Sequence, residues 1–200
     1  MGRSNVGKST LINALVRQKV ARTSAAPGKT RLANIFRVVH GSANPFYLVD
    51  LPGYGYARGG AGSAREFQEL TEAYFGRAGR EGQPGSPDLA AILLVDARHP
   101  GLSSDVRAWD WLRAKVGPRA IVATKIDKLA RGERIRALGE LQSVFDDPVL
   151  PVSAATGEGL DELWKLIDRL ANNRSPKKSR NRSRAQTAAP PHRTRPLQRR

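Results

Sequence analysis

The sequence lacks the features that mark several protein classes. It contains no cysteine, which excludes a disulfide framework and a thiolate metal site. No hydrophobic run approaches the roughly 20 apolar residues that span a bilayer, and no charged-then-apolar leader stands at the N-terminus. With 40% hydrophobic residues, the 200-residue chain has enough apolar side chains to form one hydrophobic core. We therefore expect a soluble cytoplasmic protein that does not act at a membrane.

Residues 172–200 lack acidic side chains altogether. This segment carries ten of the 34 basic residues, so that it supplies ten of the sixteen net positive charges. It also has four prolines, no Phe, Trp or Tyr, and almost no apolar residues. Such a segment cannot bury enough apolar surface to offset the entropy lost on ordering, so we expect a disordered basic tail. Its charge suits nucleic-acid phosphates with low specificity, and a solubilising extension is an equal alternative.

What the sequence does contain is a complete phosphate-binding motif. The pattern GxxxxGK[ST] runs from Gly2 to Ser9 and leads into apolar residues at helical spacing between 8 and 19. Its glycines let backbone N–H groups approach the phosphates, Lys8 adds positive charge, and the Ser9 hydroxyl can bind Mg²⁺. By itself the pattern can also be a chance glycine-rich turn. The residues expected to contact a nucleotide here are Gly2, Arg3, Ser4, Asn5, Val6, Gly7, Lys8, Ser9 and Thr10.

The rest of the chain alternates between strand and helix patterns. Residues 89–95 form an uninterrupted apolar run typical of a strand covered on both faces, and short buried strands are predicted at 120–123 and 149–152. Helices are predicted at 64–77, 105–116, 131–145 and 160–170, and an antiparallel hairpin at 31–40 and 46–49. This order predicts an α/β fold, a mostly parallel sheet with one antiparallel strand and helices on both faces.

Three further short motifs each follow a predicted strand. Residues 50–53 offer a carboxylate on the Mg²⁺ side and a backbone N–H for the γ-phosphate. In residues 124–127, the Asp127 carboxylate can accept two hydrogen bonds from guanine but not from adenine, which disfavours an ATPase. Residues 152–155 offer a backbone N–H for the guanine oxygen. The members of these motifs are Asp50, Leu51, Pro52, Gly53, Thr124, Lys125, Ile126, Asp127, Val152, Ser153, Ala154 and Ala155.

Each of these motifs alone is more simply a turn, and their conjunction carries the prediction. All four signals occur in one order, at the carboxyl edge of a parallel sheet, where such sheets bind ligands. The sequence therefore predicts a guanine-nucleotide site with Mg²⁺ at the phosphate end.

The chain resembles the EngB (YihA/YsxC) family of ribosome-biogenesis GTPases, within the TrmE-Era-EngA-EngB-septin-like class. The resemblance is carried by the phosphate loop and by residues 21–30, 50–57 (DLPGYGYA), 96–99 (DARH) and 124–127 (TKID). It runs from Gly2 to about Ala171, so we expect a P-loop G domain at 1–171 and the tail at 172–200. It implies a monomeric GTPase that binds the large-subunit precursor and ribosomal RNA, with a link to cell division and septation.

The resemblance also implies roles for a loop that the spacing leaves open. In such GTPases a threonine of a mobile loop closes over Mg²⁺ and the γ-phosphate, and Thr30 matches it, with Gly28 and Lys29 beside it. From the sequence alone Thr23 is an equal candidate. The implied catalytic residues are Lys8, Thr30, Gly53 and Asn5, and the implied Mg²⁺ ligands are Ser9, Thr30 and, through water, Asp50.

Two residues bear on the rate of hydrolysis. Tyr54 stands where many GTPases carry a water-orienting Gln, so we expect slow intrinsic turnover that a partner or an ion accelerates. Asn5 matches a position that helps hold K⁺ in related GTPases, where the ion adds positive charge. The alternative is that Asn5 only caps or tightens the loop.

The strand that normally feeds a phosphate loop is missing, because only Met1 precedes Gly2. In the resembling family that strand lies inside the sheet. Its loss would leave unpaired backbone on two neighbouring strands, at roughly 1–3 kcal/mol for each buried group. We therefore expect that Met1 is not the natural start and that this form binds GTP weakly. A second hypothesis is a nucleic-acid-binding assembly factor with a degenerate G domain that acts through its tail.

Overall fold

A computed structural model describes residues 1–21, 33–41, 45–54, 72 and 89–172. Within these residues, the strands β3 (Ala91–Asp96), β4 (Arg119–Thr124) and β5 (Val149–Pro151) form a parallel sheet in the order β3-β4-β5. A separate antiparallel pair consists of β1 (Asn34–Val38) and β2 (Phe46–Asp50), with Phe36 opposite Leu48. The helices are α1 (Lys8–Val16), α3 (Ser103–Lys115), α4 (Arg131–Phe145) and α5 (Leu160–Asn172), with a short 3₁₀ helix at Ile126–Lys128.

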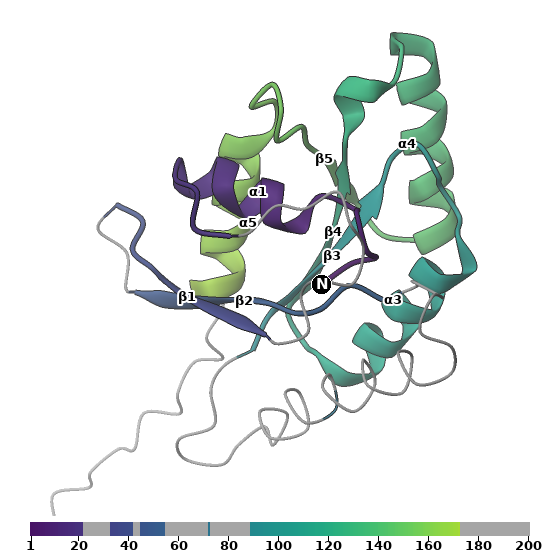
Figure 1. The fold of residues 1–200 in the computed structure, drawn as a ribbon. Helices are drawn as coiled ribbons and strands as arrows, with labels where there is room; N and C mark the ends of the chain where they lie inside the picture. Colours follow the sequence, from purple (N-terminus) through teal and green to yellow (C-terminus); the bar gives the residue numbers. More distant parts are fainter. Residues whose placement is uncertain (22–32, 42–44, 55–71, 73–88, 173–200) are drawn as a thin grey trace, which may run out of the picture.

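The helices cover both faces of the parallel sheet (Figure 1). Leu93 and Val95 of β3 pack with Trp109 of α3 and Phe145 of α4. The intervening residue, Leu94, packs on the opposite face in the cluster that α1 and α5 supply. Because successive strand residues point to opposite faces, a strand covered on both sides must be apolar throughout, which explains the continuous apolar run.

The predicted fold class is confirmed, and the element boundaries differ from the predicted ones by a few residues. The first helix was expected to reach residue 19 but ends at Val16, because Arg17 adopts a left-handed backbone with φ 52°. The Asn13 side chain then bonds both backbone groups of Ala21, each at 2.8 Å, and closes this end. Of the expected helix at 64–77 only residue 72 is described, and it is helical; of the expected tail only Asn172 is described, and it ends α5. The other residues of both segments lie outside the described residues. No described helix combines the length and the apolar character needed to span a membrane.

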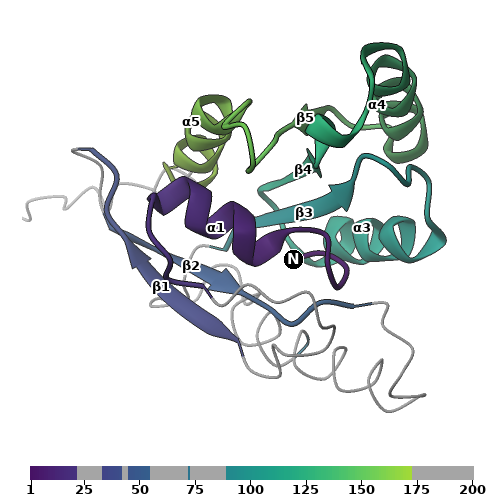
Figure 2. The same ribbon diagram turned by 45° about the horizontal axis from the view of Figure 1, so that its top comes forward.

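Residues 1–3 lie between the two sheets (Figure 2). Leu94 donates its backbone N–H to the Met1 carbonyl oxygen at 2.8 Å, Gly2 forms an isolated parallel bridge with Leu94, and Arg3 forms one with Tyr54. The Met1 amino group donates to the Ile92 carbonyl at 2.7 Å, and its burial, helped by nearby Lys8, lowers its pKa to about 5.

Next to these bridges β2 and β3 leave an apolar channel of about 460 Å³. Helices α1 and α5 also contribute to its walls. Its lining includes Leu11, Leu15, Phe46, Leu48, Ile92 and Ile167. Among the described residues the two sheets are therefore joined through isolated bridges rather than a continuous ladder.

Candidate nucleotide-binding site

The phosphate loop runs directly into α1. Gly7 precedes the helix with φ 105°, and Asn5 has φ 62°, both in the left-handed region that Gly and Asn tolerate best. The N-cap residue of α1, Gly7, has no side chain to cap the helix, so its first N–H groups and the positive end of its dipole suit an anion. Val6 is only 1% exposed and anchors the loop in the core.

Lys8 folds back on its own loop. Its Nζ donates to the carbonyl oxygens of Gly2 and Arg3, both at 3.3 Å. Burial lowers the pKa of Lys8, and the nearby Asp50 carboxylate opposes that shift. These long contacts to neutral carbonyls satisfy a cation poorly, so a phosphate would be the stronger partner.

Asp50 and Ser9 meet at the start of α1. The Ser9 hydroxyl donates to Asp50 Oδ2 at a long 3.5 Å, and the other carboxylate oxygen is buried without a hydrogen bond among the described residues. Burial raises the pKa of Asp50, against the opposing charge of Lys8. A hydroxyl and a carboxylate with an unpaired buried oxygen fit a hard cation such as Mg²⁺, which binds oxygen and keeps several waters and phosphates.

Residues 51–53 lie against the phosphate loop. A Cβ on Gly53 would stand 2.7 Å from the Ser4 nitrogen and 2.9 Å from Lys8 Nζ, so no larger residue fits. The hydroxyl of the next residue, Tyr54, donates to the buried Asp105 at 2.9 Å. The expectation that Tyr54 does not orient water as a Gln would stays a prediction.

The predicted base-recognition motifs lie side by side. Ser153 Oγ donates to Asp127 Oδ1 at 2.7 Å and accepts the N–H groups of Ala155 and Thr156, each at 3.2 Å. The hydrogen bond from Ser153 lowers the pKa of Asp127, and the neighbouring Lys128 also contributes. The carboxylate is therefore held in its charged form, which is the form that accepts two hydrogen bonds.

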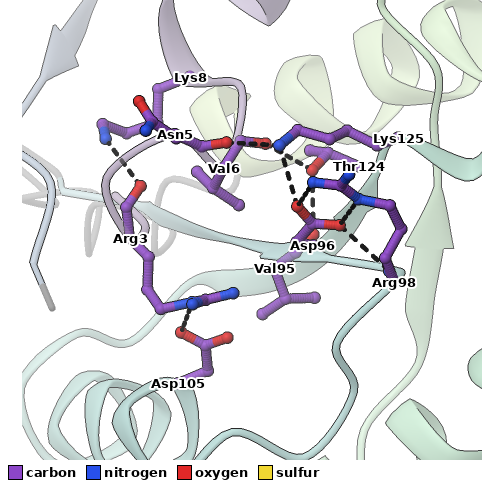
Figure 3. Close-up of polar contacts among 10 residues, drawn as sticks. All are labelled: Arg3, Asn5, Val6, Lys8, Val95, Asp96, Arg98, Asp105, Thr124 and Lys125. Atoms are coloured by element: carbon purple, nitrogen blue, oxygen red, sulfur yellow. Dashed lines mark hydrogen bonds and ion pairs between the residues drawn. The ribbon is translucent and has the colours of Figure 1, made fainter. Parts of the chain in front are cut away.

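Lys125 connects the base side to the phosphate side (Figure 3). Its Nζ donates to the Asn5 carbonyl of the loop and to Asp96 Oδ2, the latter at 2.9 Å. The Thr124 hydroxyl lies 2.7 Å from the Val6 carbonyl oxygen. Two residues of one motif thus bind the backbone of another motif about 120 positions away.

Asp96 and Arg98 belong to this network, and the motif analysis had not placed them in the site. The Arg98 side chain donates two hydrogen bonds to Asp96, at 2.9 and 2.8 Å, and its backbone N–H donates a third at 3.1 Å. Burial alone would raise the pKa of Asp96, but the bonds from Arg98 and Lys125 outweigh it and hold the pKa well below its usual range. The position of Asp96 could have pointed to it: Asp96 ends β3 and pairs with Thr124 at the end of β4, on the edge where such sheets bind ligands.

The described residues thus bring together the phosphate loop, residues 50–53, 124–127 and 152–155. The side chains of Val6, Leu51, Ile126 and Val152 are buried, so a nucleotide would meet these residues through their backbone. Gly28, Lys29 and Thr30 lie outside the described residues, and their roles stay predictions. His40 belongs to none of these motifs; its ring stacks on Trp164 with the ring centroids 4.2 Å apart and lies 3.1 Å from Asp168.

The chain is similar to known GTP-binding proteins. A family model described as 50S ribosome-binding GTPase matches residues 1–125. The probable GTP-binding protein EngB of Pelotomaculum thermopropionicum is 42% identical over 173 residues, covering 84% of this chain and 82% of that protein. The protein of the same name from Thermotoga maritima is 40% identical over 175 residues, covering 85% of this chain and 84% of that protein.

Solved structures show the same fold. A crystal structure of a probable GTP-binding protein EngB matches with a TM-score of 0.63 and 23% identity, covering 86% of this chain and 97% of that one. Aquifex aeolicus Era matches with a TM-score of 0.69 and 24% identity, covering 84% of this chain and 54% of Era. This chain has the G-domain fold of P-loop GTPases and belongs to the EngB family of GTP-binding proteins.

Proposed function

We propose that the protein is a guanine-nucleotide switch that hydrolyses GTP to GDP and phosphate with Mg²⁺. The observation that carries this proposal is the direct bonding of the base motif to the phosphate loop, through Lys125 to Asn5 and Thr124 to Val6. It fixes the distance between a charged Asp127 and the N-terminus of α1. A ligand that satisfies both ends has a guanine base at one end and phosphates at the other.

The roles follow from the chemistry of each group. The first N–H groups of α1 and the Lys8 ammonium bind the phosphates. Ser9 and Asp50, with Thr30 from the loop, would hold Mg²⁺, which when bound supplies positive charge to the β- and γ-phosphates. Gly53 presents its N–H to the γ-phosphate. Since Tyr54 is turned into the core, intrinsic hydrolysis is slow.

K⁺ held by Asn5 is a finer part of the proposal. The ion would add the positive charge that a slow GTPase lacks. The left-handed backbone of Asn5 also fits the alternative role of shaping the turn. Hydrolysis rates in K⁺ and in Na⁺ separate the two, because equal rates would leave Asn5 with the turn alone.

We further propose that residues 1–171 act as one G domain in the cytoplasm, as a monomer, during assembly of the large ribosomal subunit, with an effect on cell division and septation. Support comes from family membership and from the positive charge of residues 172–200. Binding to ribosomal particles should depend on the nucleotide. Binding that is the same with GTP, with GDP and without nucleotide would instead favour a factor that acts through its tail.

Calorimetric titration with GTP, GDP and ATP tests the central proposal. Asp127→Asn keeps an oxygen for Ser153 but replaces one acceptor with a donor, so it should weaken guanine nucleotides and favour xanthosine nucleotides, which carry a carbonyl in place of the amine. Asp161→Asn, an exposed carboxylate on α5, is the matched control. ATP binding equal to GTP binding, or an unchanged base preference in Asp127→Asn, would refute guanine recognition.

A further inference from the structure

A buried polar cluster links the phosphate loop to α3. Asp105, in the first turn of α3, is only 1% exposed, and it accepts the hydroxyl of Tyr54 at 2.9 Å. Arg3 Nε lies 3.3 Å from the same carboxylate oxygen (Figure 3). The three residues, named here the Arg3–Tyr54–Asp105 cluster, come from the loop, from the segment after β2 and from a helix on the far side of the sheet.

The backbone next to this cluster includes Gly53, to which the proposed function gives the contact with the γ-phosphate. The Ser4 N–H donates to the Tyr54 carbonyl at 3.0 Å, and Arg3 forms its bridge with Tyr54. Gly53 therefore lies directly against Ser4 and Lys8, with no room for a Cβ. A shift of Tyr54 would move the Gly53 N–H relative to the phosphate loop.

The cluster is costly to bury. Burial raises the pKa of Asp105, while the Tyr54 hydroxyl and Arg3 oppose that shift. Burial also raises the pKa of the Tyr54 phenol, so that it stays a hydrogen-bond donor at any physiological pH. Arg3 Nε makes no well-aligned hydrogen bond among the described residues and faces the Asp105 carboxylate at 3.3 Å. In such a network the loss of one bond leaves a buried group unsatisfied, which magnifies the effect of small changes.

We propose that Asp105 is a positioning residue for the γ-phosphate. By holding Tyr54 and Arg3 together, it sets the distance between the Gly53 N–H and the phosphate loop. This inference rests on the proposed guanine-nucleotide switch. GDP has no γ-phosphate, so a displaced Gly53 weakens the binding of GTP and leaves that of GDP nearly unchanged.

Affinities for GDP and for a non-hydrolysable GTP analogue, both with Mg²⁺, test the proposal on the full chain. Tyr54→Phe keeps the buried ring and removes only the hydroxyl. We expect its affinity for the analogue to fall about tenfold and that for GDP to change less than about twofold. Asp105→Asn keeps an acceptor for Tyr54 and loses the charge that faces Arg3, so its effect on the analogue should be smaller. Asp110→Asn, on the exposed face of α3, is the matched control and should change neither affinity.

The outcomes separate positioning from mere stability. Equal losses for GDP and for the analogue, or no loss in Tyr54→Phe, would overturn the role of Asp105. If the unsubstituted chain binds neither nucleotide, the proposed switch fails. Amide hydrogen exchange then tests separately whether the cluster anchors Gly53. Exchange at residues 50–54 must be faster in Tyr54→Phe than in Asp110→Asn, and equal exchange would refute the cluster as an anchor of Gly53.

Discussion

The charged side chains on the base side of the site have better hydrogen-bond partners than those on the phosphate side. On the base side, Asp127 and Asp96 each have partners within 3 Å, and both carboxyl pKa values lie below their usual range. On the phosphate side, the pKa of Asp50 is raised and that of Lys8 is lowered. Asp50 also keeps one buried oxygen without a hydrogen bond among the described residues.

The packing shows the same division. The base side stands on a continuous ladder from β3 to β5, whereas the phosphate side adjoins the channel between β2 and β3. Under the proposed function, the hydrogen bonds that already hold Asp127 would let the base side accept guanine without rearrangement, which favours specificity. Under the same proposal, the buried charges of Lys8 and Asp50 would gain their best partners only when phosphate and Mg²⁺ bind. The proposed function therefore gives base selection to one side and ligand-dependent completion to the other.

The largest effect is expected from Lys8→Met. Removal of the ammonium should lower the affinity for GTP about a hundredfold, because charged hydrogen bonds are worth about 1.5–3 kcal/mol each. Without nucleotide, the free energy of unfolding should not fall, since a poorly paired buried cation gives way to an apolar side chain. Calorimetry and denaturant unfolding measure the two quantities.

Lys165→Met, on the exposed side of α5, is the control for Lys8→Met. If Lys8→Met instead destabilised the nucleotide-free chain by several kcal/mol, Lys8 would be a structural cation, and the division between the two sides would fail.

The second prediction concerns the channel. A designed extension of six residues before Met1, with alternating valines, can run as a strand of about 20 Å parallel to β3 and replace the buried amino group with an amide. It should raise the free energy of unfolding by about 2.5 kcal/mol, because new hydrogen bonds and apolar burial exceed the entropy of ordering. A Gly-Ser extension of equal length is the control. Equal stability of the two extended chains would show that the channel does not accept a strand.

The sequence alone could not predict most of the contacts that distinguish the base side from the phosphate side. The phosphate motif and the apolar run at 89–95 are local patterns, and both predicted their elements. The contacts of Asp96 with Lys125, of Tyr54 with Asp105 and of His40 with Trp164 join residues 29 to 124 positions apart. They depend on how helices dock on the sheet, which no local pattern encodes. The order of the four motifs correctly predicted that they lie together, because parallel strands bring their carboxyl ends to one edge of the sheet.

Asp96→Asn tests the closed network of the base side. Asp96 has a lower pKa in the folded chain than in the unfolded one, so its stabilisation is present above about pH 4 and is lost as the pH falls further. The substitution should lower the free energy of unfolding by about 2 kcal/mol at pH 7 and flatten its decline below pH 4. Denaturant unfolding across this pH range measures both, with Asp161→Asn as control. If the free energy of unfolding of Asp96→Asn declined below pH 4 as steeply as that of the unsubstituted chain, Arg98 and Lys125 would not hold the charged carboxylate.

The smallest effect is expected from Ser153→Ala, and it separates the two sides most cleanly. The change removes the donor to Asp127 and the acceptor for two backbone N–H groups, at a cost of about 1 kcal/mol, or about fivefold in guanine-nucleotide affinity. Because the base is common to both ligands, GDP and the GTP analogue should lose equally, whereas Tyr54→Phe acts on the analogue alone. In the double variant the two losses should add, since the sites share no partner. If Ser153→Ala weakened the binding of the GTP analogue more than that of GDP, the base side would also respond to the phosphates.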